Sequence, residues 1–105
     1  MATRIYTEDF STKVLESDLP VLVDFYSDSC VVCKKLAPTI CEIEEDYEGK
    51  VSVFKYNTGY DKKLVEEYGI LSNPTVILFK DGQVVGKQVG AKDYDELSDW
   101  IDGLI

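Results

Sequence analysis

Short apolar runs and stretches of helical spacing alternate along the whole chain. The runs predict five strands, at residues 5–6, 21–27, 51–56, 75–80 and 83–89. The second and fourth of these are almost entirely apolar, which is typical of strands buried on both faces of a sheet. Asp81-Gly82, between the last two strands, is a strong signal for a two-residue hairpin.

Helical spacing predicts four helices, at residues 8–17, 30–47, 61–68 and from residue 93 to the end. Asp93 and Glu96 resemble a capping box at the start of the last helix. The resulting order, βαβαβαββα, predicts one α/β domain over residues 1–105. We expect a mixed central sheet of about five strands, flanked by the four helices on both faces.

The charge of the chain restricts its partners. Acidic residues outnumber basic ones by 20 to 11, giving a net charge of −9, and the lysines and arginines form no run. Nucleic acids and anionic membranes both require a basic surface, so we expect neither as a partner. No stretch approaches the about 20 apolar residues that span a bilayer, and no apolar leader follows residue 1. We therefore expect a cytoplasmic protein, and a monomeric one.

The motif Cys30-Val31-Val32-Cys33 combines two cysteines with the start of a helix. It follows a buried strand, and open α/β sheets place their chemistry at the carboxyl ends of strands. Unpaired N–H groups and the positive end of the helix dipole favour thiolate over thiol at Cys30. Thiolate is the nucleophile in disulfide exchange. Cys33, one turn further on, faces inward and can attack a mixed disulfide formed at Cys30.

A metal site is the main alternative for this cysteine pair. Zinc needs four ligands in a closed site, whereas the chain has no histidine and three cysteines in all. Cys41 follows Cys33 on the same predicted helix at a distance of roughly 12 Å along the axis, so it cannot join the pair around one ion. We predict no metal and no cofactor; two chains sharing one metal stays an alternative.

Asp24 is a carboxylate in the middle of a buried strand, where burial is costly without a partner or a purpose. Burial should raise its pKa, which makes Asp24 a candidate proton acceptor for Cys33. A structural ion pair or a solvated strand end is the alternative. Lys55 shares a strand face with Val51 and Val53, so it either pairs with Asp24 or extends its stem to a surface ammonium.

The chain resembles the thioredoxin family across essentially its whole length. The cysteine motif is itself a standard example of that family's chemistry. The matching segments are residues 23–26, 30–34, 37–38, 68–70, 73–75, 79–82 and 89–91.

The resemblance implies a role for each matching position. Cys30 would be the exposed attacking thiol and Cys33 the buried resolving one, joined in a disulfide when oxidised. Asp24 would accept the proton from Cys33, with Lys55 close to it. The thioredoxin fold and recycling by a thioredoxin reductase are implied as well.

The substrate side of the site is implied in the same way. Pro74 would be cis and face the disulfide, and the backbone of Asn73 would pair with an extended substrate segment. Gly90 would leave room for that segment. Val31 and Val32, between the cysteines, would also contact the substrate.

The chain departs from the family where the substrate docks. The family usually has Trp-Cys-Gly-Pro-Cys, and here the first position is Ser29 and the central pair is Val31-Val32. Tyr26 replaces a second tryptophan, Asn73 replaces an apolar residue, and Thr58-Gly59 departs from an acidic one. Two β-branched valines stiffen the start of the helix.

We therefore predict a protein-disulfide reductase that acts on disulfide-containing proteins and is recycled by a thioredoxin reductase. A disulfide oxidant or isomerase on the same fold is one alternative, and a redox-inert interaction module is another.

Overall fold

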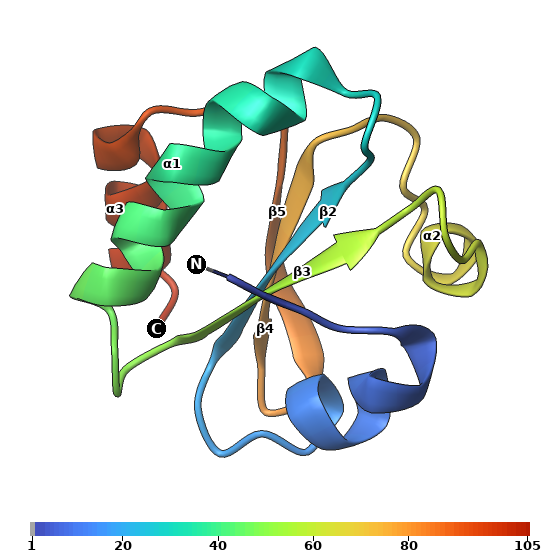
Figure 1. Cartoon of the computed structure of the whole chain (residues 1–105). Coiled ribbons are helices and arrows are strands. Elements are labelled where there is room, and N and C mark those ends of the chain that lie inside the picture. Colours follow the sequence, from blue (N-terminus) through green and yellow to red (C-terminus); the bar gives the residue numbers. More distant parts are fainter. Residues whose placement is uncertain (1) are drawn as a thin grey trace.

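The computed structural model describes residues 2–105 (Figure 1). Its strands are β1 (Thr3–Arg4), β2 (Val21–Tyr26), β3 (Ser52–Asn57), β4 (Thr75–Lys80) and β5 (Gln83–Val89). Its α-helices are α1 (Val31–Asp46), α2 (Lys63–Glu67) and α3 (Tyr94–Asp102). Two short turns, the 3-10 turn η1 (Thr7–Asp9) and the π-helical turn η2 (Ser11–Leu15), precede β2.

The five strands form one mixed sheet in the order β1-β3-β2-β4-β5. β1 and β2 run parallel to β3, whereas β4 is antiparallel to β2 and β5. Parallel neighbours need a crossover, and α1 supplies it between β2 and β3. Asp81 and Gly82 have φ values of 54° and 77° at the predicted hairpin, as a tight turn with left-handed residues requires. The predicted fold class is confirmed.

Alternation along the strands divides the core into two layers. Helices α1 and α3 cover one face of the sheet, and α2 with the N-terminal turns covers the other (Figure 1). The layer under α1 and α3 contains Leu22, Leu36, Ile40, Ile43, Tyr47, Val51, Val53, Val76, Leu78, Leu97 and Ile101. The layer under α2 contains Ile5, Phe10, Val14, Val21, Val23, Phe25, Tyr56, Leu64, Ile70, Ile77 and Phe79. β2 contributes to both layers, as its apolar run predicted.

The N-terminal segment differs from its prediction. The first strand comprises Thr3–Arg4 and not residues 5–6, and the helix expected at 8–17 is divided into η1 and η2. The Asp9 carboxylate accepts the Tyr6 N–H at 3.0 Å, which removes that donor from the sheet ladder. Phe10 is nevertheless buried in the core, so tertiary packing is satisfied by two short turns instead of one regular helix.

Ile40 anchors α1, the helix that carries both motif cysteines, against the sheet. Its side chain is fully buried, so Ile40→Ala should lower the free energy of unfolding by about 2–5 kcal/mol. Glu42→Ala, at an exposed position of the same helix, is the matched control and should change it by less than about 0.5 kcal/mol. Urea unfolding measures both values. Equal effects would show that α1 is not held by this contact.

Candidate active site

The cysteine pair caps the first turn of α1. Cys30 is the N-cap residue, with extended backbone angles, and its sulfur accepts the Cys33 N–H at 3.0 Å. The two cysteines form a disulfide, with Cα atoms 5.2 Å apart. Cys33 is buried and belongs to the inward stripe of the helix, whereas Cys30 is partly exposed. Exposed nucleophile and buried partner are thus separated by one helical turn, as disulfide exchange requires.

The loop before β4 lies at the same edge of the sheet. Phe25 of β2 pairs with Thr75 of β4, so the residues just before Thr75 lie beside the end of β2 that leads to Cys30. The Asn73–Pro74 peptide bond is cis, as the resemblance implied. Gly90 donates its N–H to the Pro74 carbonyl at 2.9 Å with a φ of 87°, and an added Cβ would meet no atom within 4 Å. Gly90 therefore leaves open space directly beside Pro74.

Asp24 lies in the centre of the sheet beneath α1. It is 5% exposed, and its Oδ1 atom has no hydrogen-bond partner among residues 2–105. Removal from water penalises the charged form, which raises the pKa of this carboxyl to about 7, although the nearby Lys55 charge opposes the rise. A carboxyl that titrates near neutrality can accept and release protons at physiological pH.

Lys55 is the in-register neighbour of Asp24 on β3. Its ammonium nitrogen lies 5.5 Å from the centre of the Tyr26 ring, and within the described residues it makes no direct ion pair with Asp24. The interaction between the two charges therefore acts across a gap. The arrangement agrees better with a lysine that extends its aliphatic stem toward a surface ammonium than with a direct ion pair to Asp24.

A cavity of about 190 Å³ lies between the cysteine pair and the buried carboxyl of Asp24. Asp24, Cys33 and Lys55 all line it, together with the active-site loop at Ser27 and Asp28. Buried Cys33 and the buried Asp24 carboxyl therefore open onto the same space. Cys41, the free cysteine, is partly exposed and lines a neighbouring cavity of about 60 Å³ that Asp24 and Lys55 also border.

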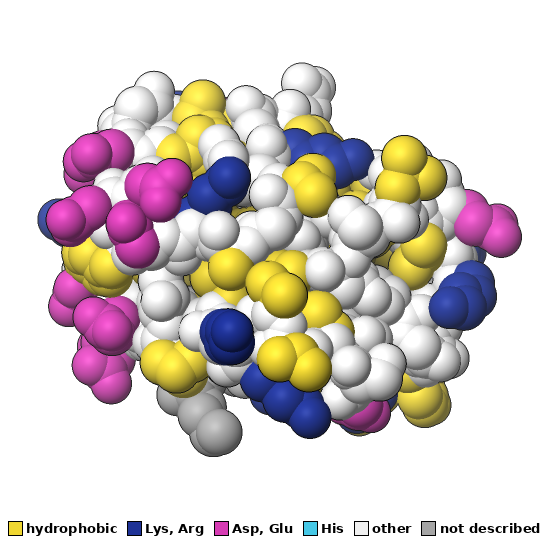
Figure 2. Space-filling model, turned by 90° about the horizontal axis from the view of Figure 1, so that it is seen from above, with side chains coloured by type: hydrophobic (Ala, Val, Ile, Leu, Met, Phe, Trp, Pro, Cys, Tyr) yellow, Lys and Arg dark blue, Asp and Glu magenta, His cyan; other side chains and the backbone are white. Residues whose placement is uncertain are grey.

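The rim of the site is apolar and exposed. Val31 and Val32 are 64% and 43% exposed at the tip of α1, and Leu71, just before Asn73, is 97% exposed. Seen from the end of the molecule that carries the start of α1, hydrophobic side chains occupy the middle of the surface and acidic ones gather at the α1–α3 flank (Figure 2). Leu71, in the loop between α2 and β4, was not predicted.

A polar network that the sequence did not predict fixes this rim. The Asn73 amide nitrogen donates to the Thr58 hydroxyl at 3.0 Å, and that hydroxyl donates to the Tyr26 carbonyl at 3.2 Å. The Thr58 N–H also donates to Tyr26, at 2.8 Å. The loop after β3 therefore ties the cis-proline loop to the end of β2. Thr58 and Asn73, two positions at which the chain departs from the usual family residues, are therefore hydrogen-bonded to each other. No local sequence pattern indicates this contact.

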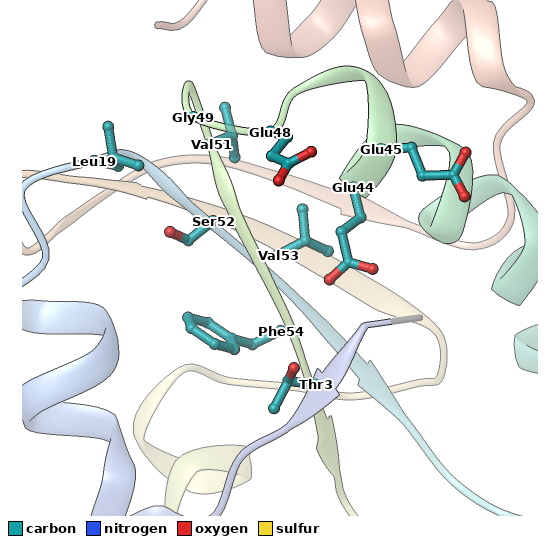
Figure 3. Close-up of a pocket in the computed structure, with 10 residues that line it drawn as sticks. All are labelled: Thr3, Leu19, Glu44, Glu45, Glu48, Gly49, Val51, Ser52, Val53 and Phe54. Carbon is teal, nitrogen blue, oxygen red and sulfur yellow. The ribbon is translucent and has the colours of Figure 1, made fainter.

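A hollow of about 450 Å³ lies at a different place, between the end of α1 and strand β3 (Figure 3). Glu44, Glu48 and Phe54 are among the side chains on its walls. None of the residues that the sequence singled out for chemistry lines it. Size alone therefore does not identify the site; the reactive groups do.

Within residues 2–105, no helix is both long enough and apolar enough to cross a bilayer. Over the same residues, no cluster of three or more histidine, cysteine, aspartate or glutamate side chains is arranged to hold a metal ion.

The mixed sheet, the cis-proline loop and the vicinal cysteines above a buried carboxyl define a dithiol–disulfide oxidoreductase. The thioredoxin family model matches residues 2–103. The thioredoxin of Rickettsia felis is 44% identical over 105 residues, covering all of both chains. Thioredoxin 1 of a Nostoc species is 43% identical over 97 residues, which is 92% of this chain and 91% of that one. The chain belongs to the thioredoxin family, and it is a thioredoxin-type disulfide reductase with the thioredoxin fold.

The raised pKa of Asp24 makes the stability of the fold depend on pH. The folded protein keeps a proton up to about pH 7 that the unfolded chain loses near 3.8, so the contribution of this group is most favourable below about pH 4. The free energy of unfolding should fall by about 1.4 kcal/mol per pH unit between about pH 4 and pH 7, roughly 4 kcal/mol in all, of which about 3 kcal/mol is lost between pH 5 and pH 8, and it should level off above pH 7. Asp24→Asn should abolish this fall and be more stable than the parent at pH 8. Urea unfolding at pH 5 and pH 8 measures it, with the exposed Asp28→Asn as control.

Proposed function

We propose that the chain acts as a single domain over residues 1–105 and reduces protein disulfides through an atypical Cys-Val-Val-Cys site. The observation that carries this proposal is the shared cavity, onto which buried Cys33 and buried Asp24 both open. An isolated pair of cysteines needs no such neighbour, whereas a resolving thiol that must lose a proton does.

The first step takes place at Cys30. Its thiolate, favoured at the start of α1, attacks one sulfur of a substrate disulfide and forms a mixed disulfide. The other substrate sulfur leaves as a thiolate and takes up a proton from solvent. The exposure of Cys30 relative to Cys33 supports this order of attack.

The second step takes place at Cys33. Its thiol gives a proton to the Asp24 carboxylate and its sulfur attacks the Cys30 sulfur, so that the second substrate thiolate is released. Two electrons have then passed from the Cys30–Cys33 pair to the substrate, and the pair is oxidised. We assign Lys55 the role of holding the pKa of Asp24 below the value that burial alone would give.

We place the substrate against the cis-proline loop. Neither backbone group of Asn73 forms a hydrogen bond with other residues of the described chain, so both are available to an extended segment. Pro74 and Gly90 form the floor of that path, and the exposed Val31 and Val32 supply an apolar contact.

The partners follow from the same chemistry. The oxidised pair must be reduced again, and we propose a thioredoxin reductase for that step, with disulfide-containing proteins as substrates. The relatives are named thioredoxins, which supports this pairing. No cofactor takes part in either step. The cytoplasmic location, the monomeric state and the absence of nucleic-acid or membrane partners stay predictions.

The direction of electron flow depends on the dipeptide between Cys30 and Cys33. Val31-Val32 is the feature that keeps an oxidant or isomerase as the second candidate, because the residues between the cysteines adjust the stability of the disulfide. We expect the midpoint potential of the couple to lie below the cytosolic glutathione poise. Equilibration with thiol buffers in a Cys41→Ser background measures it, and a potential above that poise would reverse the proposed direction.

The two cysteines should differ sharply when one is removed. In the same Cys41→Ser background, Cys33→Ser should lose turnover but accumulate a stable mixed disulfide with its substrate, because the resolving sulfur is gone. Cys30→Ser should lose turnover without trapping anything. Insulin reduction and non-reducing gels followed by mass spectrometry measure both outcomes. If the parent chain binds partner proteins but reduces no disulfide, the redox-inert interaction module is favoured instead.

Asp24 should control the resolving step and not the attack. The rate of resolution should rise with pH through about 7, because only the ionised carboxyl accepts a proton. Asp24→Asn should slow resolution about 10²-fold at pH 7 and remove this inflection. Stopped-flow decay of a preformed mixed disulfide at Cys30 isolates the step. An unchanged pH profile in Asp24→Asn would assign the proton to another acceptor.

A further inference from the structure

We propose that a second hollow, beside the active-site loop, is a docking subsite for a carboxylate side chain of the substrate, with Arg4 as the residue that binds it. The subsite rests on the proposed reductase function and determines which disulfides are reduced fastest. It occupies the side of Cys30 where the family usually has a tryptophan and this chain has Ser29.

Arg4 lies on β1, the edge strand of the sheet, between two tyrosine rings. It pairs with Lys55 at the end of β1, and its guanidinium carbon lies 4.8 Å from the ring centre of Tyr6 and 5.1 Å from that of Tyr60. The two rings contact each other edge-on, with centres 5.2 Å apart. Aromatic faces attract the cation without neutralising it. The charge is therefore fixed in place before any partner arrives, which reduces the entropy lost on binding.

The hydrogen-bonding capacity of Arg4 is not used within the described chain. Its Nε atom is buried and has no hydrogen-bond partner among residues 2–105, and in the same residues no carboxylate lies within 4.0 Å of the guanidinium. A guanidinium presents a planar fork of donors that matches the two oxygens of a carboxylate. The buried Nε atom cannot itself reach a ligand, so the terminal nitrogens of the guanidinium are the donors that would bind, and their positive charge favours a carboxylate over an uncharged ligand.

The position of the hollow connects it to the chemistry. It measures about 460 Å³ and lies between Arg4 and Tyr60 on one side and Ser27–Ser29 on the other. The hydroxyls of Ser27 and Ser29 form no hydrogen bonds inside the described chain, so they can add donors to a bound carboxylate. Because Ser29 precedes Cys30, a group in this hollow must come from a residue close to the disulfide under attack.

Asp28 is the feature that limits the subsite. Its carboxylate also lines the hollow, where it accepts a hydrogen bond from the Asn57 amide at 3.3 Å and makes no ion pair with Arg4. It repels an incoming carboxylate while Arg4 attracts it. The two residues therefore act with opposite sign on the same ligand, and their substitutions must have opposite effects.

The net charge of the chain limits which acidic substrates can reach the subsite. A net charge of −9, with acidic side chains gathered on the α1–α3 flank, repels acidic partners at long range (Figure 2). A single fixed cation next to Cys30 then favours one correctly placed acidic residue and not an acidic protein in general. Specificity would come from position near the disulfide.

The test uses disulfide-bonded peptides in which a single glutamate is placed in turn at each position flanking one cysteine. Each glutamate peptide is matched by a control peptide with glutamine at the same position. We expect a position at which the full chain reduces the glutamate peptide with about fivefold higher kcat/KM than its match, carried by KM and weakened by added salt. Arg4→Gln should bring this ratio to about one, and Asp28→Asn should raise it. Lys13→Gln, an exposed cation outside the hollow, should leave it unchanged.

Other results would contradict the subsite or the reductase function itself. Equal rates for glutamate and glutamine at every position would overturn the subsite, as would a preference that survives in Arg4→Gln. If Arg4→Gln does not fold, Asp28→Asn still tests the proposal, because an unchanged ratio in that variant contradicts it. If the parent reduces no peptide at all, the reductase function fails and not the subsite alone.

Discussion

Strand β2 is the element on which the other parts of the site depend. It is hydrogen-bonded to a neighbour on each side and buried on both faces, so its position is fixed by four sets of contacts at once. Its residues then place the chemistry by simple geometry. Alternation puts Asp24 under α1, and the end of the strand delivers the chain to Cys30 one short loop later. A rigid strand is what allows a carboxyl and a cysteine on different elements to share one small cavity.

Depth in the fold gives two side chains of the same type, Cys30 and Cys33, different surroundings. Cys30 caps a helix at the surface, where dipole and N–H groups favour its thiolate and a substrate can reach it. Cys33 lies one turn deeper, buried against the cavity that it shares with Asp24, and its sulfur is bonded to that of Cys30. The order of events in disulfide exchange is therefore a consequence of depth. In the proposed reaction, the exposed Val31 and Val32 would add apolar binding surface without adding reactive groups.

The sequence predicted what depends on neighbours along the chain. Strand alternation located Asp24, and the three-residue spacing of the cysteines located the pair on its helix. It failed where contacts join distant residues. The Thr7 hydroxyl donates to the carboxylate of Asp61, and the Asn73–Thr58 bond joins two separate loops; neither leaves a periodic trace. The clamp of Arg4 between two tyrosine rings was missed for the same reason, because β1, η1 and the loop after β3 meet only in the folded chain.

The buried carboxyl at the centre of the sheet also bears on how the sequence can change. The Oδ1 atom of Asp24 has no hydrogen-bond partner within residues 2–105, and the charged form of the side chain opposes folding, so an uncharged residue of similar size would stabilise the fold. Selection for heat resistance alone would therefore replace Asp24 early, whereas selection for the proposed proton transfer from Cys33 would retain it. The identity of residue 24 in a descendant of this protein would then show whether selection for catalysis or selection for thermal stability had been stronger.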